Sequence, residues 1–250
     1  MSGHSKWATI HRAKEVTDAK RGQVFTKLAN AIIVAVRAGG GAVDPAANFK
    51  LRLAVEKARE FNMPKENIAR AIAKGSGEGG GADWEEIVYE GYGPHGIAIM
   101  IEAATDNKKR TASEIKNILE KGGGTLAGPG AVAFQFEKKG LIVVSQQGNS
   151  EEVILKIMDL GVDDIEEALD AIEIYTKPEE FEETKNKLAS TGFTIVSSEL
   201  VMKPLTSVAI TDEHSASKII DFLKKLEDQA DVQRVFANFD IPQEILEKLG

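Results

Sequence analysis

The chain has 250 residues, of which 42% are hydrophobic and 28% are charged, a balance typical of soluble globular proteins rather than disordered or fibrous ones. It has no cysteine, which excludes disulfides, thiolate catalysis and cysteine-ligated zinc or iron–sulfur sites. The formal net charge is −8, but residues 1–75 carry 14 Lys and Arg against 6 Asp and Glu, whereas residues 76–250 carry 17 against 33. This division of charge is typical of a basic arm that binds a polyanion and is joined to an acidic body.

The first part of the chain has the period of helices. Apolar residues recur at helical spacing over residues 25–36, which predicts a helix that ends at the glycines 39–41. Asp44 followed by Pro45 is a helix-start signal and predicts a second helix. A third, short helix is predicted to end at Gly75. Together these elements predict a basic helical N-terminal domain over residues 1–77.

A glycine-rich tract follows, and beyond it the period changes to that of strands. We expect strands near residues 87–89 and 96–102, a helix capped by Asp106, a loop over residues 122–130, and a strand over residues 132–136. Lys138-Lys139-Gly140 is interpreted as a hairpin turn into the next strand.

The remaining elements alternate in a way that predicts two ferredoxin-like units. The six elements 141–145, 150–160, 163–168, 171–176, 178–190 and 193–201 give the order βαββαβ, and the tail adds a further βαβ with strands 206–210 and 232–239. We therefore predict an α+β multidomain fold, in which a discontinuous ferredoxin-like domain, residues 83–137 plus 204–240, is interrupted by an inserted βαββαβ domain, residues 138–203.

The best candidates for polyanion contact are basic or aromatic residues near the N-terminus, where acidic residues are few. Lys and Arg release counterions from a nucleic-acid backbone, and an aromatic side chain can stack on an unpaired base. The alternatives are that the cations form a solvated face and that the Trp anchors the next helix. The candidates are His4, Lys6, Trp7, His11, Arg12, Lys14, Lys20, Arg21 and Lys27.

A second candidate is the basic group Lys108, Lys109 and Arg110 in the first turn of a predicted helix, where positive charge opposes the helix dipole. Either these side chains extend into water, or they and the exposed amides of the helix start face an anion.

No pattern in the sequence indicates catalysis or a bound cofactor. The glycine loops lack a Walker Gly-Lys-Ser/Thr, the four histidines lack metal-ligand spacing, and no nucleophile motif occurs. We therefore expect a non-enzymatic protein without metal, cofactor or small-molecule substrate. The N-terminus has no apolar signal-peptide region and no apolar run approaches the roughly 20 residues that span a bilayer, so we expect a cytoplasmic protein without a membrane partner.

Two blocks of residues resemble the YebC family over essentially the whole chain. The first comprises residues 3–8 (GHSKWA), 18–22 (DAKRG), 25–27 (FTK) and 62–64 (NMP); the second comprises residues 89–94 (YEGYGP), 106–107 (DN), 110–111 (RT) and 134–140 (FQFEKKG). The resemblance implies a helical N-terminal domain followed by two α/β domains, one inserted into the other.

The resemblance also implies a regulatory role, in one of two forms. The family is usually described as cytoplasmic DNA-binding transcriptional regulators, while a mitochondrial relative activates translation and some bacterial members act with the ribosome. The expected partner is therefore DNA, or else ribosomal RNA together with ribosomal proteins. A protein-interaction module that binds neither nucleic acid is the remaining alternative.

Overall fold

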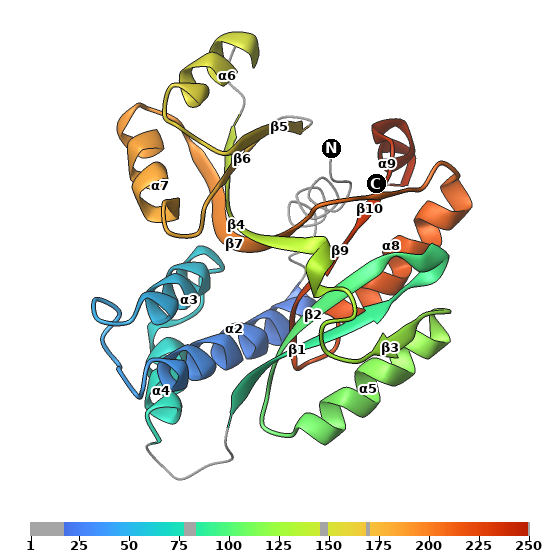
Figure 1. Ribbon diagram of the computed structural model, residues 1–250. Helices are drawn as coiled ribbons and strands as arrows, with labels where there is room; N and C mark the ends of the chain where they lie inside the picture. The colour runs from blue at the N-terminus through green and yellow to red at the C-terminus, as the bar shows by residue number, and fades with distance from the viewer. Residues whose placement is uncertain (1–17, 78–83, 146–149, 169–170, 250) are drawn as a thin grey trace.

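The computed structural model describes residues 18–77, 84–145, 150–168 and 171–249. Three helices come first, α2 (Asp18–Ala38), α3 (Phe49–Glu60) and α4 (Lys65–Gly75), which we call the helical unit (Figure 1). The predicted apolar stripe of α2 is confirmed, since Leu28, Ile32 and Val36 are buried against α3 and α4. The predicted start of the second helix at Asp44 is wrong. Asn48 is its cap, and Asp44 instead accepts a hydrogen bond from the amide of Ala46 in the preceding turn.

A four-stranded antiparallel sheet forms the centre of the molecule. Its strands are β1 (Glu85–Tyr92), β2 (Ala98–Thr105), β3 (Thr125–Ala127) and β9 (Val232–Ala237), in the order β3-β1-β2-β9. Helices α5 (Lys108–Lys121) and α8 (Glu213–Glu227) cover the face that carries Ile97, Ile99 and Ile101. We call this sheet with its two helices the split unit, because one strand and one helix come from the C-terminal part of the chain (Figure 1).

The second sheet belongs to the inserted unit, residues 136–204. Its strands are β4 (Phe136–Ser145), β5 (Asp164–Ala168), β6 (Ala171–Thr176) and β7 (Ile195–Pro204), with helices α6 (Ser150–Met158) and α7 (Phe181–Ser190) between them. The strand order β5-β6-β4-β7 is that of a ferredoxin-like fold, and α6 and α7 pack on one face through Ile157, Phe181 and Leu188. The chain is therefore an α+β protein with a helical part and two α/β units, one inserted into the other, as predicted.

Two predictions at the start of the inserted unit, the strand 132–136 and the hairpin turn at residues 138–140, are wrong. Residues 133–135 form the 3₁₀ turn η2 (Ala133–Gln135), and β4 then runs without interruption through the predicted hairpin at Lys138-Lys139-Gly140. A Cβ at Gly140 would lie 2.5 Å from both the Phe181 ring and the Thr176 hydroxyl. This glycine therefore permits close packing inside a strand and does not make a turn.

The C-terminal part also differs from the prediction. The expected strand 206–210 is the short β8 (Val208–Ala209), which pairs in parallel with β10 (Phe239–Asp240) instead of joining the four-stranded sheet. Two further elements are the 3₁₀ turn η1 (Pro94–Gly96) and the terminal helix α9 (Gln243–Leu249). Across the residues that the structure describes, no helix is long and apolar enough to cross a membrane.

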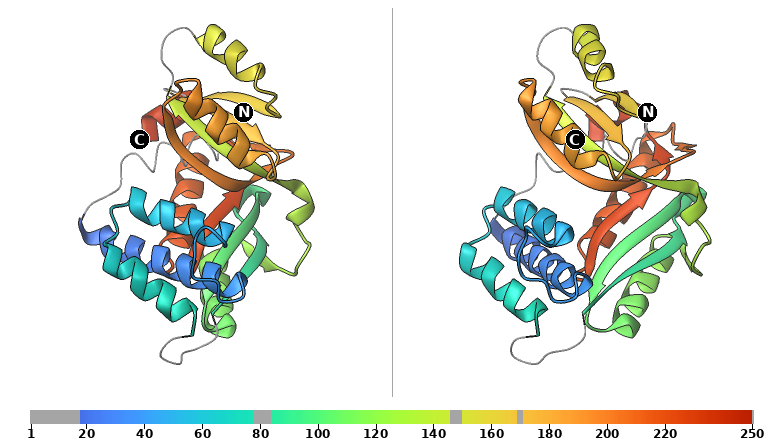
Figure 2. Two further views of the ribbon diagram at one scale, coloured as in Figure 1. Left: turned by 90° about the vertical axis from the view of Figure 1, so that its left-hand side faces the viewer. Right: turned by 60° about the vertical axis from the view of Figure 1, so that its left-hand side comes forward.

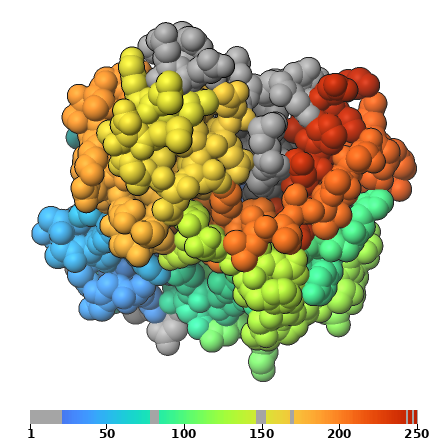
Figure 3. Space-filling view, turned by 45° about the horizontal axis from the view of Figure 1, so that its top comes forward, coloured from blue at the N-terminus to red at the C-terminus, as the bar shows by residue number. Residues whose placement is uncertain are grey.

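The helical unit is docked on both α/β units. Helix α2 lies against β1, β2 and β9, on the opposite side of that sheet from α5 (Figure 2). Helix α3 contacts the inserted unit through two ion pairs, Lys57 with Glu199 at 3.0 Å and Glu56 with Lys185 at 3.2 Å. In the space-filling view the orange part of the inserted unit accordingly lies beside the blue helical unit (Figure 3).

Candidate nucleic-acid interface

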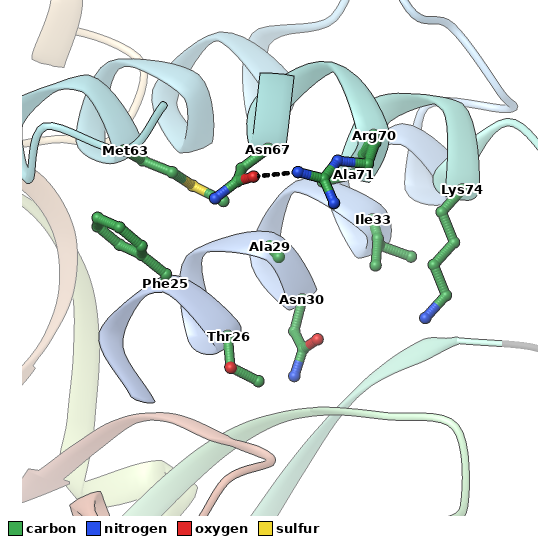
Figure 4. Close-up of a pocket in the computed structure, with 10 residues that line it drawn as sticks. All are labelled: Phe25, Thr26, Ala29, Asn30, Ile33, Met63, Asn67, Arg70, Ala71 and Lys74. Carbon is green, nitrogen blue, oxygen red and sulfur yellow. Dashed lines mark hydrogen bonds between the residues drawn. The ribbon is translucent and has the colours of Figure 1, made fainter. Parts of the chain in front are cut away.

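A groove runs between α2 and α4 on the helical unit. The two helices pack closely because α4 ends in a glycine: a Cβ at Gly75 would lie 2.8 Å from Cβ of Val36 and 2.9 Å from the carbonyl oxygen of Ile33. Away from this contact the helices leave a hollow of about 350 Å³ (Figure 4). It is lined by Phe25, Thr26, Ala29, Asn30 and Ile33 of α2, by Met63, and by Asn67, Arg70, Ala71 and Lys74 of α4.

The polar side chains of α4 are held in place along this groove. The guanidinium of Arg70 donates to Oδ1 of Asn67 at 2.6 Å (Figure 4). Because a guanidinium has donors only, this contact requires the amide oxygen of Asn67 to face it and leaves the amide NH₂ as a donor. The ammonium of Lys74 lies 5.0 Å from the centroid of the Trp84 ring, within the range of a cation–π interaction.

Further cations lie at the end of the helical unit where α2 begins. The turn between α3 and α4 carries Met63, which lines the groove together with Phe25 from the early part of α2. Arg59 and Lys65 flank this turn and are exposed. Neither was predicted from the sequence, because single cations separated by several residues give no clear signal before the helices are paired.

Most of the predicted N-terminal contacts lie outside the described residues: His4, Lys6, Trp7, His11, Arg12 and Lys14. Lys20 lies in the first turn of α2, but its side chain is also outside the described part. Arg21 is exposed in the same turn. Asp18, the first described residue, begins α2 at the end of the helical unit that carries Arg59 and Lys65.

Lys27 has a different environment from the other predicted cations. Its side chain is partly buried, and Nζ donates to the carbonyl oxygen of Glu227 at the C-terminal end of α8. Burial lowers the pKa of Lys27, while Glu227 and Asp228 act in the opposite direction. In this structure the ammonium therefore joins α2 to α8, where the negative end of the helix dipole also favours a cation.

The second predicted group, at the start of α5, is largely occupied by protein carboxylates. Lys108 pairs with Glu85 at 2.6 Å, and Arg110 lies 2.9 Å from Asp231 and 3.0 Å from Asp106. Asn107, rather than the predicted Asp106, is the cap of the helix and accepts from the amide of Arg110. Lys109 is exposed. Two of the three cations thus take part in the fold of the split unit.

The carboxylate of Asp231 is the centre of a buried polar network in this unit. It is 5% exposed, and Oδ2 accepts from the hydroxyl of Thr111 at 2.7 Å and from Arg110. Burial raises the pKa of Asp231, but the hydrogen bonds from Thr111 and Arg110 and the charge of Arg110 outweigh it, so the pKa is lowered.

Glu90 has a similar role at the other end of the sheet. Its carboxylate is 7% exposed and accepts from the backbone amides of Gly130, Val132 and Ala133 at 2.6–2.9 Å. Burial raises the pKa of Glu90, and the three amide donors together overcome burial and lower it. Glu90 and the Arg110-Thr111 pair both belong to the motifs that carry the family resemblance, and in the structure both support the fold.

These features define a three-part α+β protein with a cationic helical unit. A family model described as the TACO1/YebC N-terminal domain matches residues 5–78, and another described as the TACO1/YebC second and third domain matches residues 84–239. The chain therefore belongs to the TACO1/YebC family.

Similar proteins span the full chain. Those from Dictyoglomus turgidum and Aquifex aeolicus are 45% and 47% identical, each over 100% of both chains, and both are named "Probable transcriptional regulatory protein". The crystal structure of a conserved hypothetical protein, Aq1575 from Aquifex aeolicus, has a TM-score of 0.82 at 45% identity, covering 92% of this chain and 94% of that one.

Proposed function

We propose that the chain is a cytoplasmic, non-enzymatic regulator of transcription that binds DNA through its helical unit. The observation that carries the proposal is the position of exposed cations at one end of this unit: Arg21, Arg59 and Lys65 lie at the end where α2 begins. Lys and Arg that neutralise phosphates release counterions and so supply the sequence-independent part of the affinity. The names of the relatives support a role in transcription.

The acidic body limits how the helical unit meets a duplex. With a net charge of −8, the whole protein repels a polyanion at long range, and attraction is confined to the cationic surface. We therefore expect modest affinity with a steep dependence on salt. The acidic α/β units are then directed away from the nucleic acid, toward solvent or a partner protein.

Salt-dependent binding of labelled duplex DNA to the full-length protein tests this proposal. Replacing Arg21, Arg59 and Lys65 together with Gln should reduce the slope of log affinity against log salt by about 0.9 for each phosphate that the variant no longer neutralises. The matched control replaces the exposed Lys121, Lys138 and Lys218 of the α/β units with Gln. A flat salt dependence of the wild type, or an equal reduction in the control, would refute the assignment.

A ribosome-associated translation factor is the second candidate. The observation that favours it is the acidic composition of residues 76–250, with 33 Asp and Glu against 17 Lys and Arg, which suits contact with basic ribosomal proteins. The helical unit would then contact ribosomal RNA. Cosedimentation with ribosomes at physiological salt, without preference for promoter DNA, would favour this role over the first.

A further inference from the structure

The groove between α2 and α4 has features that phosphate binding alone does not use. Its volume of about 350 Å³ lies within the range of small-molecule sites, about 300–1,000 Å³. Phe25, Ile33 and Met63 give it apolar walls, and Ala29 and Ala71 keep its floor open (Figure 4). Groups that only bind a sugar–phosphate backbone do not need an apolar hollow, so the groove suits a ligand with a flat apolar part.

The same groove is polar and positive on the α4 side. Arg70 and Lys74 are one helical turn apart, and both are exposed along the groove. None of the ten described residues that line it is acidic. An anionic group attached to the apolar part of a ligand would therefore meet two cations there.

Asn67 supplies a directional contact between these two regions. Its amide oxygen is taken by Arg70, so its NH₂ group is the part free to donate toward the groove. The ring nitrogens and carbonyl oxygens of nucleobases are acceptors of this kind. An aromatic wall, a fixed amide donor and flanking cations are the groups with which proteins bind single-stranded nucleic acids.

We propose that this groove binds one unpaired nucleobase, whose edge accepts from Asn67 and whose phosphate lies beside Arg70 and Lys74. The inference rests on the proposed function, because it concerns the same helical unit, and it adds that the ligand is single-stranded where it enters the groove. Either RNA or locally opened DNA provides this chemistry. A base inside a duplex does not, since it must leave the stack to reach such a site.

The test compares strands that differ only in their bases, with the full-length wild-type protein. The probes are oligo-dT and oligo-U of about 12 nucleotides and an abasic strand of the same length, because base–aromatic stacking adds affinity that phosphates alone do not give. We expect at least one base-bearing strand to bind about ten-fold more tightly than the abasic strand. The comparison of dT with U separates a DNA source from an RNA source.

A substitution places the effect in the groove. Asn67→Leu fills the space and removes the donor, and should remove most of the advantage of the base-bearing strand while leaving abasic binding unchanged. The control is Asn117→Leu, the same change at an exposed position of α5, which should leave all three strands unaffected. Because the wild-type comparison needs no variant, the absence of a base advantage would overturn the inference even if Asn67→Leu does not fold.

The possible failures are distinguishable. If duplex and abasic strands bind and the bases add nothing, the groove is no base site, while the proposed function stands. If Asn67→Leu folds and retains the full base advantage, base binding occurs elsewhere, and the inference is wrong. If no nucleic acid binds at all, both proposals fail together.

Discussion

Arg110 and Asp231 are 121 positions apart in the sequence and meet with 2.9 Å between Nη2 and Oδ2. The contact joins the first turn of α5 to the residue before β9, which are the N-terminal and C-terminal parts of the split unit. Arg110 remains exposed, whereas Asp231 and its second donor, Thr111, are buried. The pair therefore joins the two parts of the split unit across the insertion, with the carboxylate of Asp231 as its buried member.

Replacing Asp231 with Ala should destabilise the protein by about 1–3 kcal/mol, because Thr111 and Arg110 both lose their hydrogen bonds to a charged, buried acceptor. Urea unfolding followed by circular dichroism measures this change. The control is Glu183→Gln, which breaks the exposed pair between Glu183 and Lys187 at 2.7 Å on α7 and should change stability by about 0.5 kcal/mol or less. Equal effects of the two substitutions would contradict the role of the buried network.

Acid should destabilise the fold through Glu90 and Asp231. Both carboxyl pKa values are lowered in the folded protein, so each ionised group stabilises the fold above its unfolded pKa, and this contribution is lost as pH falls through the folded pKa. For Glu90 the loss begins below its ordinary pKa of 4.5. The wild type should therefore lose stability steeply below this pH.

The variant Glu90→Gln tests the contribution of this carboxylate. It should be less stable at neutral pH by about 1–3 kcal/mol, because the Gln NH₂ group faces backbone donors in place of an acceptor. It should also lose less stability than the wild type below pH 4.5, since it has no carboxylate to protonate there. Unfolding free energies measured from neutral to acid pH give both quantities, and parallel curves would disprove the assignment.

Replacement by Ala should have opposite effects on stability at Gly75 and at Gly22. Gly75→Ala places a methyl group against Val36 and Ile33 and should cost about 1–3 kcal/mol through overpacking. Gly22→Ala lies in α2 with no atom within 4 Å of the added Cβ, so it should stabilise by about 0.5–1 kcal/mol. Thermal unfolding of the two variants measures both effects. A stabilising Gly75→Ala would show that α2 and α4 can move apart enough to accept the methyl group without loss of stability.

Lys57→Met should weaken the contact of α3 with the inserted unit, because the Glu199 side chain is only 9% exposed and loses this ion pair. Faster hydrogen exchange in α3 is the expected readout. Lys50→Met on the same helix breaks a pair in which both side chains, Lys50 and Glu86, are about half exposed, and should leave exchange unchanged. Similar exchange in the two variants would mean that the pair between Lys57 and Glu199 does not hold α3 against the inserted unit.

The sequence was informative where one local pattern determined the structure. The apolar spacing of α2 and the βαββαβ order of the inserted unit were both predictable, because periodicity reports which face of an element is buried. Gly140 and Asp44 were wrongly interpreted because their roles depend on distant or competing groups. The ring of Phe181 explains the glycine, and the side chain of Asn48, not that of Asp44, reaches the free amide of Leu51.

The candidate site was less accessible to such reasoning. Charge composition indicates the helical unit as a whole, but Arg70 and Asn67 become part of a site only when α4 lies beside α2. Likewise, no local pattern separates Lys27 from its neighbours. Its contact with Glu227, which is 200 positions away in the sequence, depends on how α2 packs against α8.

The path of the chain into and out of the insertion has a mechanical consequence. It enters along β4 and leaves along β7, and these strands are paired from Phe136 opposite Pro204 onward, while Arg234 of β9 bonds to the carbonyl oxygen of Leu200. A paired ribbon resists bending far more than two separate linkers would. The inserted unit should therefore not swing independently of the central sheet, and a displacement of it would be passed on to α3 through the two ion pairs.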